Sequence, residues 1–268
     1  MHLRSFAATQ LLSQESIELR APHDQRQVIG TMPVCSKDDL AKVIVQAKIV
    51  QNEWAQQSIE VRASAIESFI PLIEARLDEL VEVLKAEQGM LDSVVRREVQ
   101  ESISQIKHTL QVGPAELASI HLEDGAFTAE VRKVPFGITA AIVPWNAPIS
   151  LATAKVIPAL LSGNAIIVKP SPRAPIGVTQ FLDLLRGCLP PGLISVLHGL
   201  DELGEAMIQH PDIRKISFTG STAVGKRVAA SAASELKSVQ LELGGNDAAV
   251  VLSDADIKTT ATQLIDSA

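Results

Sequence analysis

The sequence predicts an α/β fold: a doubly wound, mainly parallel sheet covered by helices on both faces, with N-terminal helices packed on it. Three observations favour this fold. From Gly137 onward, β-prone apolar runs alternate with helix-like segments through short links. Before Gly137, three segments carry apolar residues at helical spacing. The 268 residues, 46% hydrophobic and 21% charged, suffice for one large domain or two small ones with a sizeable core.

The N-terminal part is predicted to begin with short strands and to continue as helices. Residues 1–35 place turn residues between short β-prone runs, which favours a hairpin laid on a larger body. Ser36 precedes two acidic residues and is a typical N-cap, so a helix is expected over 37–55. A second helical region follows, which Pro71 kinks or divides and Gly89 closes.

A hairpin is predicted at 121–136, after a third helix over 92–111. The letters "EDG" are a turn signal, and "FTAEVRKV" alternates as strands do. Such a hairpin is either an edge ribbon or an arm that pairs with another subunit. The chain therefore divides into N-terminal strands and helices (1–120), the hairpin (121–136) and an α/β domain (137–268).

The α/β part is predicted to contain six strands and five helices. The strands are expected at about 138–143, 165–169, 193–197, 214–218, 239–243 and 248–252. The helices are expected at about 149–161, 175–187, 201–209, 221–233 and from 255 to the end.

Composition excludes several functions. The net charge is −7, and no block of lysine and arginine interleaves with aromatic residues, so we expect no nucleic-acid partner. The N-terminus has no apolar stretch of signal-peptide length. The most apolar stretch, 148–168, is interrupted by a lysine, a proline and an asparagine, so no membrane span is expected. Cys35 and Cys188 lie far apart, which predicts no disulfide framework, no metal site and a cytoplasmic protein.

The segment "ISFTGSTAVGK", residues 216–226, is the first that suggests chemistry. A strand ending at Phe218, a turn with Gly220 and a helix starting at Ser221 would present free N–H groups, which suit a phosphate. Gly220 and Gly225 follow the spacing G-x-x-x-x-G, not the common dinucleotide fingerprint. The turn therefore either holds a phosphate or only joins a strand to a helix.

Three further strand ends carry polar groups. Asn146 stands between two prolines in "PWNAPIS", where its amide can donate to a developing oxyanion or serve as a turn residue. Lys169 follows an apolar strand, where it can bind a ribose or phosphate or lie in solvent. Glu242 in "LELGGND" lies between apolar neighbours and is either a general base or an edge-strand glutamate.

Taken together, these segments resemble the NAD(P)-dependent aldehyde dehydrogenase superfamily. The resemblance extends from about residue 17 to the end. It rests on five motifs in the family's order: "PFGITAAIVPWNAPI", "ALLSGNAIIVKPSPRAP", "PPGLISVLHG", "ISFTGSTAVGK" and "LELGGNDAAVV". It implies that 137–268 is a Rossmann-like NAD(P)-binding domain, that 1–120 supplies its N-terminal strands and helices, and that 121–136 is the oligomerisation arm.

The resemblance also implies roles for single residues. Asn146 matches the side-chain donor of the oxyanion hole, and Glu242 matches the base that activates water for thioester hydrolysis. Lys155 matches a lysine that supports the active-site asparagine in many relatives. The residues expected at the cofactor are Val143, Pro144, Trp145, Lys169, Ser171, Pro172, Gly199, Gly220, Ser221, Gly225, Leu243 and Gly244. Among them, Lys169 is implied to bind ribose, Gly220 and Ser221 to face the pyrophosphate, and Leu243 and Gly244 to border the nicotinamide.

The family's nucleophile is a cysteine about thirty residues after the position of Glu242. The sequence ends at Ala268, before that point, so most of the catalytic domain is expected to be missing. Cys35 and Cys188 stand at the wrong positions to replace it. We therefore expect this chain alone to be inactive, less stable than an intact enzyme, and either oligomeric through the arm or poorly soluble.

NAD or NADP is the implied cofactor. Many relatives carry a glutamate three residues after the strand-end lysine, and here that place is Pro172, followed by Arg173. Loss of the acid removes a group that repels a 2′-phosphate, and Arg173 can pair with one. The sequence therefore predicts that NADP is tolerated, or even preferred to NAD.

The implied function is the oxidation of an aldehyde to a carboxylic acid through a cysteine thioester, by a homo-oligomer, dimer or tetramer. Two alternatives remain open: a nucleotide-binding or assembly module without catalysis, and an acylating or semialdehyde-specific relative. Glu242 speaks against the acylating version, because a base at this place favours hydrolysis.

Overall fold

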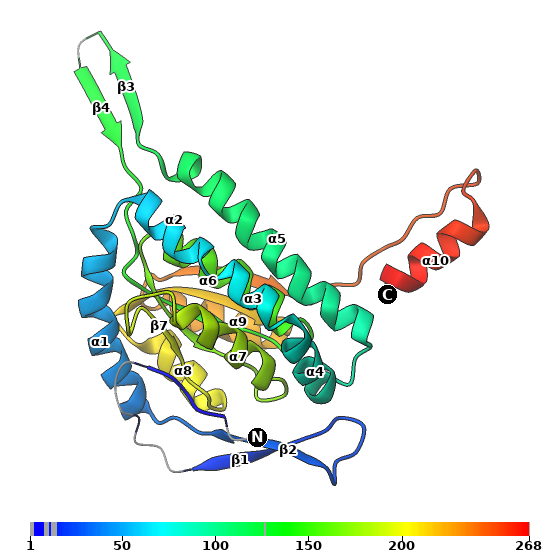
Figure 1. The fold of residues 1–268 in the computed structure, drawn as a ribbon. Helices are drawn as coiled ribbons and strands as arrows, with labels where there is room; N and C mark the ends of the chain where they lie inside the picture. Colours follow the sequence, from blue (N-terminus) through cyan, green and yellow to red (C-terminus); the bar gives the residue numbers. More distant parts are fainter. Residues whose placement is uncertain (1–2, 8–10, 12–14, 126, 268) are drawn as a thin grey trace.

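The centre of the molecule is a five-stranded parallel sheet, seen in Figure 1. The computed structural model describes residues 3–7, 11, 15–125 and 127–267. The sheet order is β7-β6-β5-β8-β9. Its strands are β5 (Ile138–Ile142), β6 (Ala165–Lys169), β7 (Ile194–Val196), β8 (Ile213–Gly220) and β9 (Ser238–Leu243).

The sheet is doubly wound, as predicted. The chain steps from β5 to β6 and β7 on one side, and then returns to β8 and β9 on the other side of β5. Because such crossovers are right-handed, the two directions of winding place their helices on opposite faces. Helices α6 (Pro148–Leu161) and α7 (Ile176–Arg186) contact each other on one face. Helices α1 (Lys37–Ala55), α8 (Asp201–Gln209) and α9 (Thr222–Ala233) cover the other.

Four N-terminal helices form an outer layer against α6 and α7. They are α2 (Ile59–Glu67), α3 (Ile70–Ala75), α4 (Leu77–Gln88) and α5 (Asp92–Leu117). Pro71 lies in the first turn of α3, so it divides the helical region as predicted. Gly89 ends α4 in the left-handed region, at φ 70°. One buried apolar cluster joins side chains of these helices, α1 and the sheet.

Two segments differ from the sequence prediction. Helix α5 continues six residues past the expected end at 111, through Gly113 and Pro114. A Cβ on Gly113 would lie 2.4 Å from Cδ2 of Leu161, so the glycine permits the close packing of α5 on α6 that keeps this turn helical.

The strand expected at 248–252 is the second difference, and that prediction is wrong. Residues 244–252 have no regular secondary structure, and Val250, Val251 and Leu252 are exposed. A strand needs a neighbour for its backbone hydrogen bonds. Within the described residues β9 is the last strand on its side of the sheet, so the apolar run has nothing to pair with.

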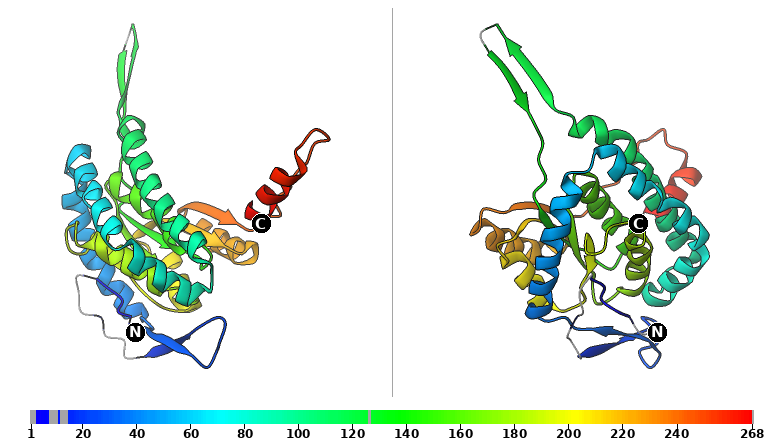
Figure 2. Two further views of the ribbon diagram at one scale, coloured as in Figure 1. Left: turned by 45° about the vertical axis from the view of Figure 1, so that its right-hand side comes forward. Right: turned by 60° about the vertical axis from the view of Figure 1, so that its left-hand side comes forward.

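Three elements project from this body in the views of Figure 2. The hairpin of β3 (Ile120–Asp124) and β4 (Phe127–Val131) is exposed along its length. Helix α10 (Ile257–Ser267) stands away from the sheet. At the N-terminal side, β1 (Ser16–Arg20) and β2 (Val28–Pro33) form the antiparallel hairpin predicted for residues 1–35.

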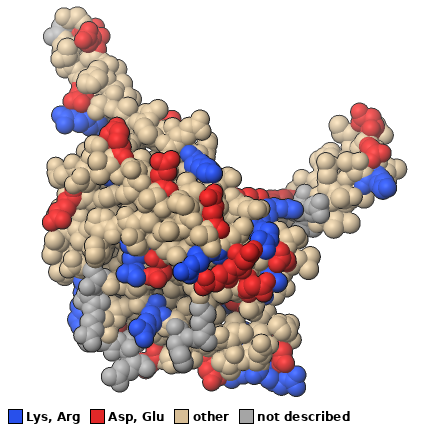
Figure 3. Space-filling model, viewed as in Figure 1, with Lys and Arg blue, Asp and Glu red and all other residues tan. Residues whose placement is uncertain are grey.

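None of the helices in the described ranges is long and apolar enough to cross a bilayer. On the face drawn in Figure 3, lysine and arginine side chains are interspersed with acidic ones.

Candidate functional site

The strand ends that carry the candidate residues meet at one edge of the sheet. In the parallel register Ile142 lies beside both Lys169 and Phe218, and Thr219 lies beside Glu242. The segment 143–146, Lys169, the turn at 220–221 and Glu242 therefore share the carboxyl edge. The winding reverses between β5 and β8, which is where open α/β sheets form a ligand crevice.

A cavity of about 450 Å³ opens between α8 and α9 at this edge. We call it the α8–α9 slot. The apolar part of its lining consists of Ile142, Gly204, Ile208, Phe218, Val224, Val228 and Ala230. The polar part consists of Lys169, Asp201, Glu205, Gln209, Arg227 and Ser231. A narrow apolar slot with polar groups around it suits a flat heterocycle attached to a polar tail.

Lys169 lies in the wall of this slot and is almost fully buried. Burial lowers the pKa of its ammonium to about 8, and the nearby carboxylates of Asp201 and Glu202 oppose that shift. Gly204 faces the stem of Lys169, because a Cβ there would lie 3.8 Å from Cδ and Cε. The ammonium of Lys169 makes no hydrogen bond to another described residue, so it remains available to a ligand in the slot.

Strand β8 continues to Gly220, two residues past the predicted end at Phe218, so only Ser221 separates it from α9. Ser221 is the N-cap of α9, and its hydroxyl accepts a hydrogen bond from the N–H of Val224 at 3.3 Å. Gly220 is required here, since a Cβ would lie 2.6 Å from the ring of Phe218. Among the described side chains, no carboxylate bonds to the N–H groups of residues 221–224, which we call the α9 start. The α9 start therefore remains available to an anion.

The helices on the other face start differently. The N-cap residues of α6 and α7 are Ala147 and Pro175, whose side chains cannot accept a hydrogen bond from the first N–H groups of the helix. Instead Glu98 accepts from the N–H of Ile149 at 2.7 Å and from that of Ser150 at 3.3 Å. Buried carboxylates of the outer helices thus accept hydrogen bonds from the first N–H groups of both helices. Glu98 binds those of α6, and a second glutamate binds those of α7.

That second glutamate is Glu87, the penultimate residue of α4. Its carboxylate accepts from the N–H of Ile176 at 2.6 Å and from that of Gly177 at 2.8 Å. Burial raises the pKa of Glu87 and of Glu98 to about 7, while the backbone N–H groups that they bind oppose the shift. The next residue, Gln88, donates from Nε2 to the carbonyl of Trp145 at 2.9 Å, so α4 also holds the turn that contains Asn146.

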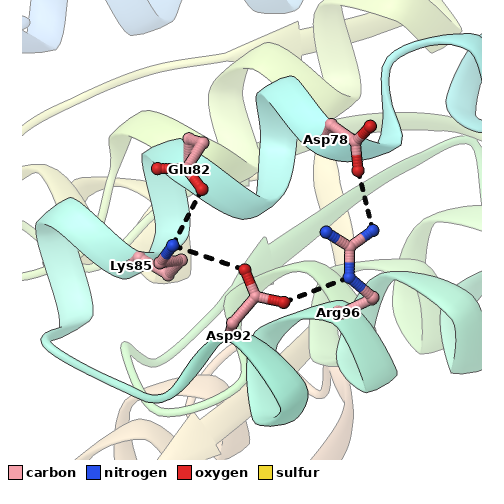
Figure 4. A network of polar contacts seen from close by, with 5 residues as sticks. All are labelled: Asp78, Glu82, Lys85, Asp92 and Arg96. Carbon is pink, nitrogen blue, oxygen red and sulfur yellow. Dashed lines mark hydrogen bonds and ion pairs between the residues drawn. The ribbon is translucent and has the colours of Figure 1, made fainter.

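The two helices that carry these glutamates are joined by ion pairs, drawn in Figure 4. Arg96 of α5 binds Asp78 of α4 at 2.8 Å and Asp92 at 3.1 Å. Lys85 of α4 binds Glu82 at 2.8 Å and Asp92 at 3.3 Å. The network therefore ties α4 to α5 close to both carboxylates.

Asn146 and Glu242, the predicted catalytic residues, are both exposed at the carboxyl edge of the sheet. Asn146 is exposed in the turn after β5, next to the half-exposed Trp145. Glu242 is exposed on β9. Lys155 is buried in α6, which lowers the pKa of its ammonium, and the charge of Glu242 partly offsets that effect. The structure therefore places Lys155 near the glutamate; it makes no hydrogen bond with Asn146.

Several of the other predicted cofactor residues lie around this edge. The side chain of Leu243 packs where a Cβ on Gly225 would stand, at 2.3 Å, so the glycine lets β9 and α9 approach closely. Gly199 is packed against Leu203, with a Cβ position 2.7 Å from Cδ2. Val143 and Pro144 follow β5, Ser171 follows β6, and Gly244 follows β9 at the exposed end.

Pro172 and Arg173 belong to a different cavity, of about 460 Å³. We call it the Trp145 cavity, because it lies between Trp145, the start of α7 and the β1–β2 hairpin. Neither Pro172 nor Arg173 lines the α8–α9 slot. The two loops after β5 and β6 thus face a second hollow that sequence reasoning did not anticipate.

Neither cysteine lies at the carboxyl edge beside Asn146. Cys35 is buried, its thiol bonds to Oγ of Ser5 at 3.1 Å, and burial raises the pKa of that thiol. Cys188 follows the end of α7. Within the described residues, no group of three His, Cys, Asp or Glu side chains is arranged to hold a metal ion.

Sequence reasoning missed the residues that shape the site from outside the motifs. Glu87 and Glu98 act at sequence separations of about ninety and fifty residues, which no local pattern reveals. The slot-lining face of α8 had a usable signal: Asp201, Gly204, Glu205 and Ile208 recur at helical spacing.

Comparison with known proteins gives a consistent result. The profile of the aldehyde dehydrogenase family matches residues 10–268. The betaine aldehyde dehydrogenase of Rhizobium etli is 34% identical over 233 residues, which is 86% of this chain and 48% of that protein. The chain spans about half the length of the curated relatives it matches.

Solved structures agree over nearly the whole chain. The NADP-dependent glyceraldehyde-3-phosphate dehydrogenase of Bacillus halodurans C-125, complexed with NADP, matches with TM-score 0.92 and 29% identity, over 99% of this chain and 58% of that one. A Sinorhizobium meliloti 1021 protein assigned as a methylmalonate-semialdehyde dehydrogenase, complexed with NAD, matches with TM-score 0.94 and 27% identity, over 100% and 55%. The parallel sheet, its carboxyl edge and these matches lead to one conclusion: the chain belongs to the aldehyde dehydrogenase family.

Proposed function

We propose that this chain binds NAD or NADP in the α8–α9 slot and contributes to the oxidation of an aldehyde to a carboxylic acid. One observation carries the proposal: the slot wall that holds Lys169 and the α9 start lie at the same switch point of the sheet. Related proteins of known structure are complexed with NADP or with NAD, which supports the same assignment.

The residues of this chain fit a dinucleotide. The slot between α8 and α9 has the size and apolar lining for an adenine, with Gly204 leaving room beside Lys169. Lys169 would donate to ribose hydroxyls. The N–H groups of the α9 start would bind the diphosphate, and the absence of Cβ at Gly220 lets it approach the backbone.

The proposed chemistry assigns one task to each catalytic candidate. Asn146 donates its amide N–H to the oxyanion that forms when a thiolate adds to the aldehyde carbonyl. A nicotinamide bound at this edge would supply the acceptor for the hydride of the aldehyde carbon. Glu242 then takes a proton from the water that hydrolyses the thioester. Its exposed position on β9 leaves room for that water.

The thiol itself is proposed to come from a residue outside this sequence. Cys35 is buried under Ser5 with a raised thiol pKa, which disfavours the reactive thiolate, and Cys188 lies at the end of α7. An aldehyde-oxidation assay of the 268-residue chain, with NAD or NADP as acceptor, would contradict this assignment if it produced reduced cofactor.

Dinucleotide binding is the direct test of the function. Titration with NAD and with NADP by calorimetry should show one site per chain, and Lys169→Met should weaken both ligands about tenfold, since one charge-assisted hydrogen bond is lost. Lys42→Met, which removes an exposed lysine of α1, is the matched control and should bind as the unmodified protein does. If neither dinucleotide binds, or if both lysine variants behave alike, the proposal is wrong.

We further propose that the β3–β4 hairpin joins copies of this chain into a dimer or tetramer. Ile120, Leu122, Phe127 and Val131 are 49–65% exposed on it, and exposed apolar side chains that lie together are typical of protein–protein contact sites. Light scattering should detect an oligomer, and Leu122→Glu together with Phe127→Glu should convert it to a monomer. A monomer before any substitution would contradict this part of the proposal.

A further inference from the structure

We propose that the α8–α9 slot recognises the base of the nucleotide that it binds: Glu205 selects a purine with an amino group at position 6, and Arg227 holds the Glu205 carboxylate in place for that contact. Adenine is such a purine, whereas hypoxanthine and guanine carry an oxygen at position 6. This inference rests on the proposed function and concerns the same site.

The first step is where the base lies in the slot. Helices α8 and α9 both begin at the carboxyl edge of the sheet and run away from it, and the slot continues along them as far as Gln209 and Ser231. Burial lowers the pKa of the Lys169 ammonium, and the nearby carboxylates of Asp201 and Glu202 oppose that shift, so Lys169 lies beside the first turn of α8. With the diphosphate at the α9 start and the ribose at Lys169, the base therefore extends toward the second turn of α8.

The second step is which charged groups lie at that depth. Glu205 follows Asp201 by one turn of α8, and Arg227 lies in the second turn of α9. Both line the slot, and beyond the level of Lys169 and Asp201 its lining holds no other charged side chain from the part of the chain that the structure describes. The base therefore has these two charges next to it, and otherwise apolar or uncharged polar walls.

The third step is the geometry of the pair. The guanidinium of Arg227 donates from Nη2 to Oε1 of Glu205, and this contact joins the two walls of the slot. The two side chains are 60% and 54% exposed, so the pair lies at the mouth of the slot, whereas Phe218 of the sheet is buried at its floor. The second oxygen of Glu205 and the other N–H groups of Arg227 bind no further side chain among the described residues, so they are available to a ligand. An exposed ion pair contributes little to stability, so the fold does not depend on this one.

The fourth step is the match between the pair and the base. An ionised carboxylate only accepts hydrogen bonds, and a guanidinium only donates them. Adenine presents its 6-amino donor beside a ring nitrogen that accepts, so it can donate to Glu205 while it accepts from Arg227. A 6-oxo purine places an acceptor against the carboxylate, which has no proton to donate. A site arranged to bind one polar group discriminates against an analogue that lacks this group.

The experiment compares NAD with nicotinamide hypoxanthine dinucleotide, in which an oxygen replaces the 6-amino group. For the unmodified protein, calorimetry should give a dissociation constant about tenfold higher for the hypoxanthine dinucleotide, because one hydrogen bond to a charged group is lost. ADP and IDP should differ by the same factor. That second comparison separates the base from the nicotinamide and does not depend on the folding of any variant.

Substitutions at the pair test each residue. Glu205→Gln should bring the ratio of the two dissociation constants close to one, since a carboxamide can donate to the 6-oxygen as well as accept from the 6-amino group. Arg227→Met should also lower the ratio, because the carboxylate loses the partner that holds it, and Arg227→Lys should restore part of it. The matched control is Glu79→Gln: Glu79 pairs with Arg76 at 2.9 Å and is as exposed as Glu205, but it lies outside the slot. This control should leave the ratio unchanged.

Each outcome decides between the proposals. Equal binding of NAD and its hypoxanthine analogue by the unmodified protein, or tighter binding of the analogue, overturns this inference and leaves the proposed function standing. An unchanged ratio in Glu205→Gln or in Arg227→Met, or an equal fall in Glu79→Gln, also overturns it. If neither dinucleotide binds, the proposed function fails, and this inference fails with it.

Discussion

Three helices that follow strands of the sheet, α6, α7 and α9, begin in two different ways. At α6 and α7 the first N–H groups are filled by buried carboxylates, Glu98 and Glu87, that come from the outer helices. At α9 the only side-chain acceptor among the described residues is the hydroxyl of Ser221, and the start is exposed. Since every helix start attracts negative charge, the carboxylates fill the starts of α6 and α7, whereas the start of α9 stays open to a ligand.

The comparison also separates rigid from adaptable parts of the edge. The loops before α6 and α7, which contain Asn146 and Ser171, lead into helix starts that bind the buried carboxylates of Glu98 and Glu87, and the partly buried Gln88 donates to the carbonyl of Trp145. The α9 start is held only by its own cap and by the packing of Gly225 against Leu243. We infer that the first two loops position groups and that the third receives the anion.

Removal of one buried cap is expected to give the largest effect. Glu98→Ala leaves the buried N–H of Ile149 and the partly buried N–H of Ser150 without their side-chain acceptor, which should lower the free energy of unfolding by about 2–4 kcal/mol. Urea denaturation measures this. Glu101→Ala, an exposed site on the same helix, should change it by less than about 0.5 kcal/mol. Equal effects at the two sites would show that the α6 cap contributes nothing.

The second largest effect is expected when a carboxylate is added to the α9 start. Ser221→Asp should weaken dinucleotide binding roughly 100-fold, because the new charge takes the place proposed for the diphosphate. The fold should remain stable, since aspartate is also a good N-cap. Ser58 caps α2 with the same hydrogen bond, to the N–H of Val61, so Ser58→Asp is the matched control. A similar loss of binding in both variants would break the comparison.

The charge of Lys169 should give an effect of about tenfold. Burial lowers the pKa of its ammonium to about 8, so the cation is present at neutral pH and is lost as the pH rises above that value. The dissociation constant of NAD should therefore rise about tenfold between pH 7 and pH 9.5, since one charged donor is lost. In Lys169→Met this rise should disappear; a rise that persists would assign the pH dependence to another group.

The state of the Glu98 cap should appear in the pH dependence of stability. Burial raises its pKa from 4.5 to about 7. The folded protein therefore binds this proton more tightly than the unfolded chain, and the stability it contributes is present below pH 4.5 and is lost as the pH rises through 7. The unmodified protein should therefore lose stability relative to Glu98→Gln as the pH rises from 4.5 to 7. A flat difference would mean that Glu98 is ionised throughout.

The ion pairs between α4 and α5 should give the smallest effect. Arg96→Gln removes contacts to Asp78 and Asp92, all on partly exposed side chains, so the loss of stability should stay under about 1 kcal/mol. Dinucleotide affinity should not change. A large loss of affinity would mean that this network, rather than the buried caps, positions the edge of the sheet.

Much of the fold follows from local signals. Ser36 and Asp39 form the capping box that starts α1, and Pro71 and Gly89 divide and end the helices where expected. The four strand ends with candidate residues converge because parallel strands all end at one edge. Where tertiary contacts decide, the sequence failed. Packing on Leu161 keeps α5 helical past Gly113, and residues 248–252 lack a neighbouring strand.

The candidate site was predictable to the same degree. Lys169, Gly220 and Ser221 were identifiable because Lys169 and Gly220 are the last residues of β6 and β8, and Ser221 follows β8 directly. The cavity that each side chain lines could not be predicted. Arg173 comes four residues after Lys169, yet the two side chains line different cavities. The buried caps were invisible too, because they link residues far apart in the chain.

Backbone amide NMR of the protein titrated with ADP tests the central claim most directly, because it reports on each helix start separately. If the α9 start binds the diphosphate, the largest shifts will fall on the N–H groups of residues 221–224, with little change at Ile149, Ile176 and Gly177. Shifts concentrated at the starts of α6 or α7, or saturation by ADP without any shift at 221–224, would contradict the account.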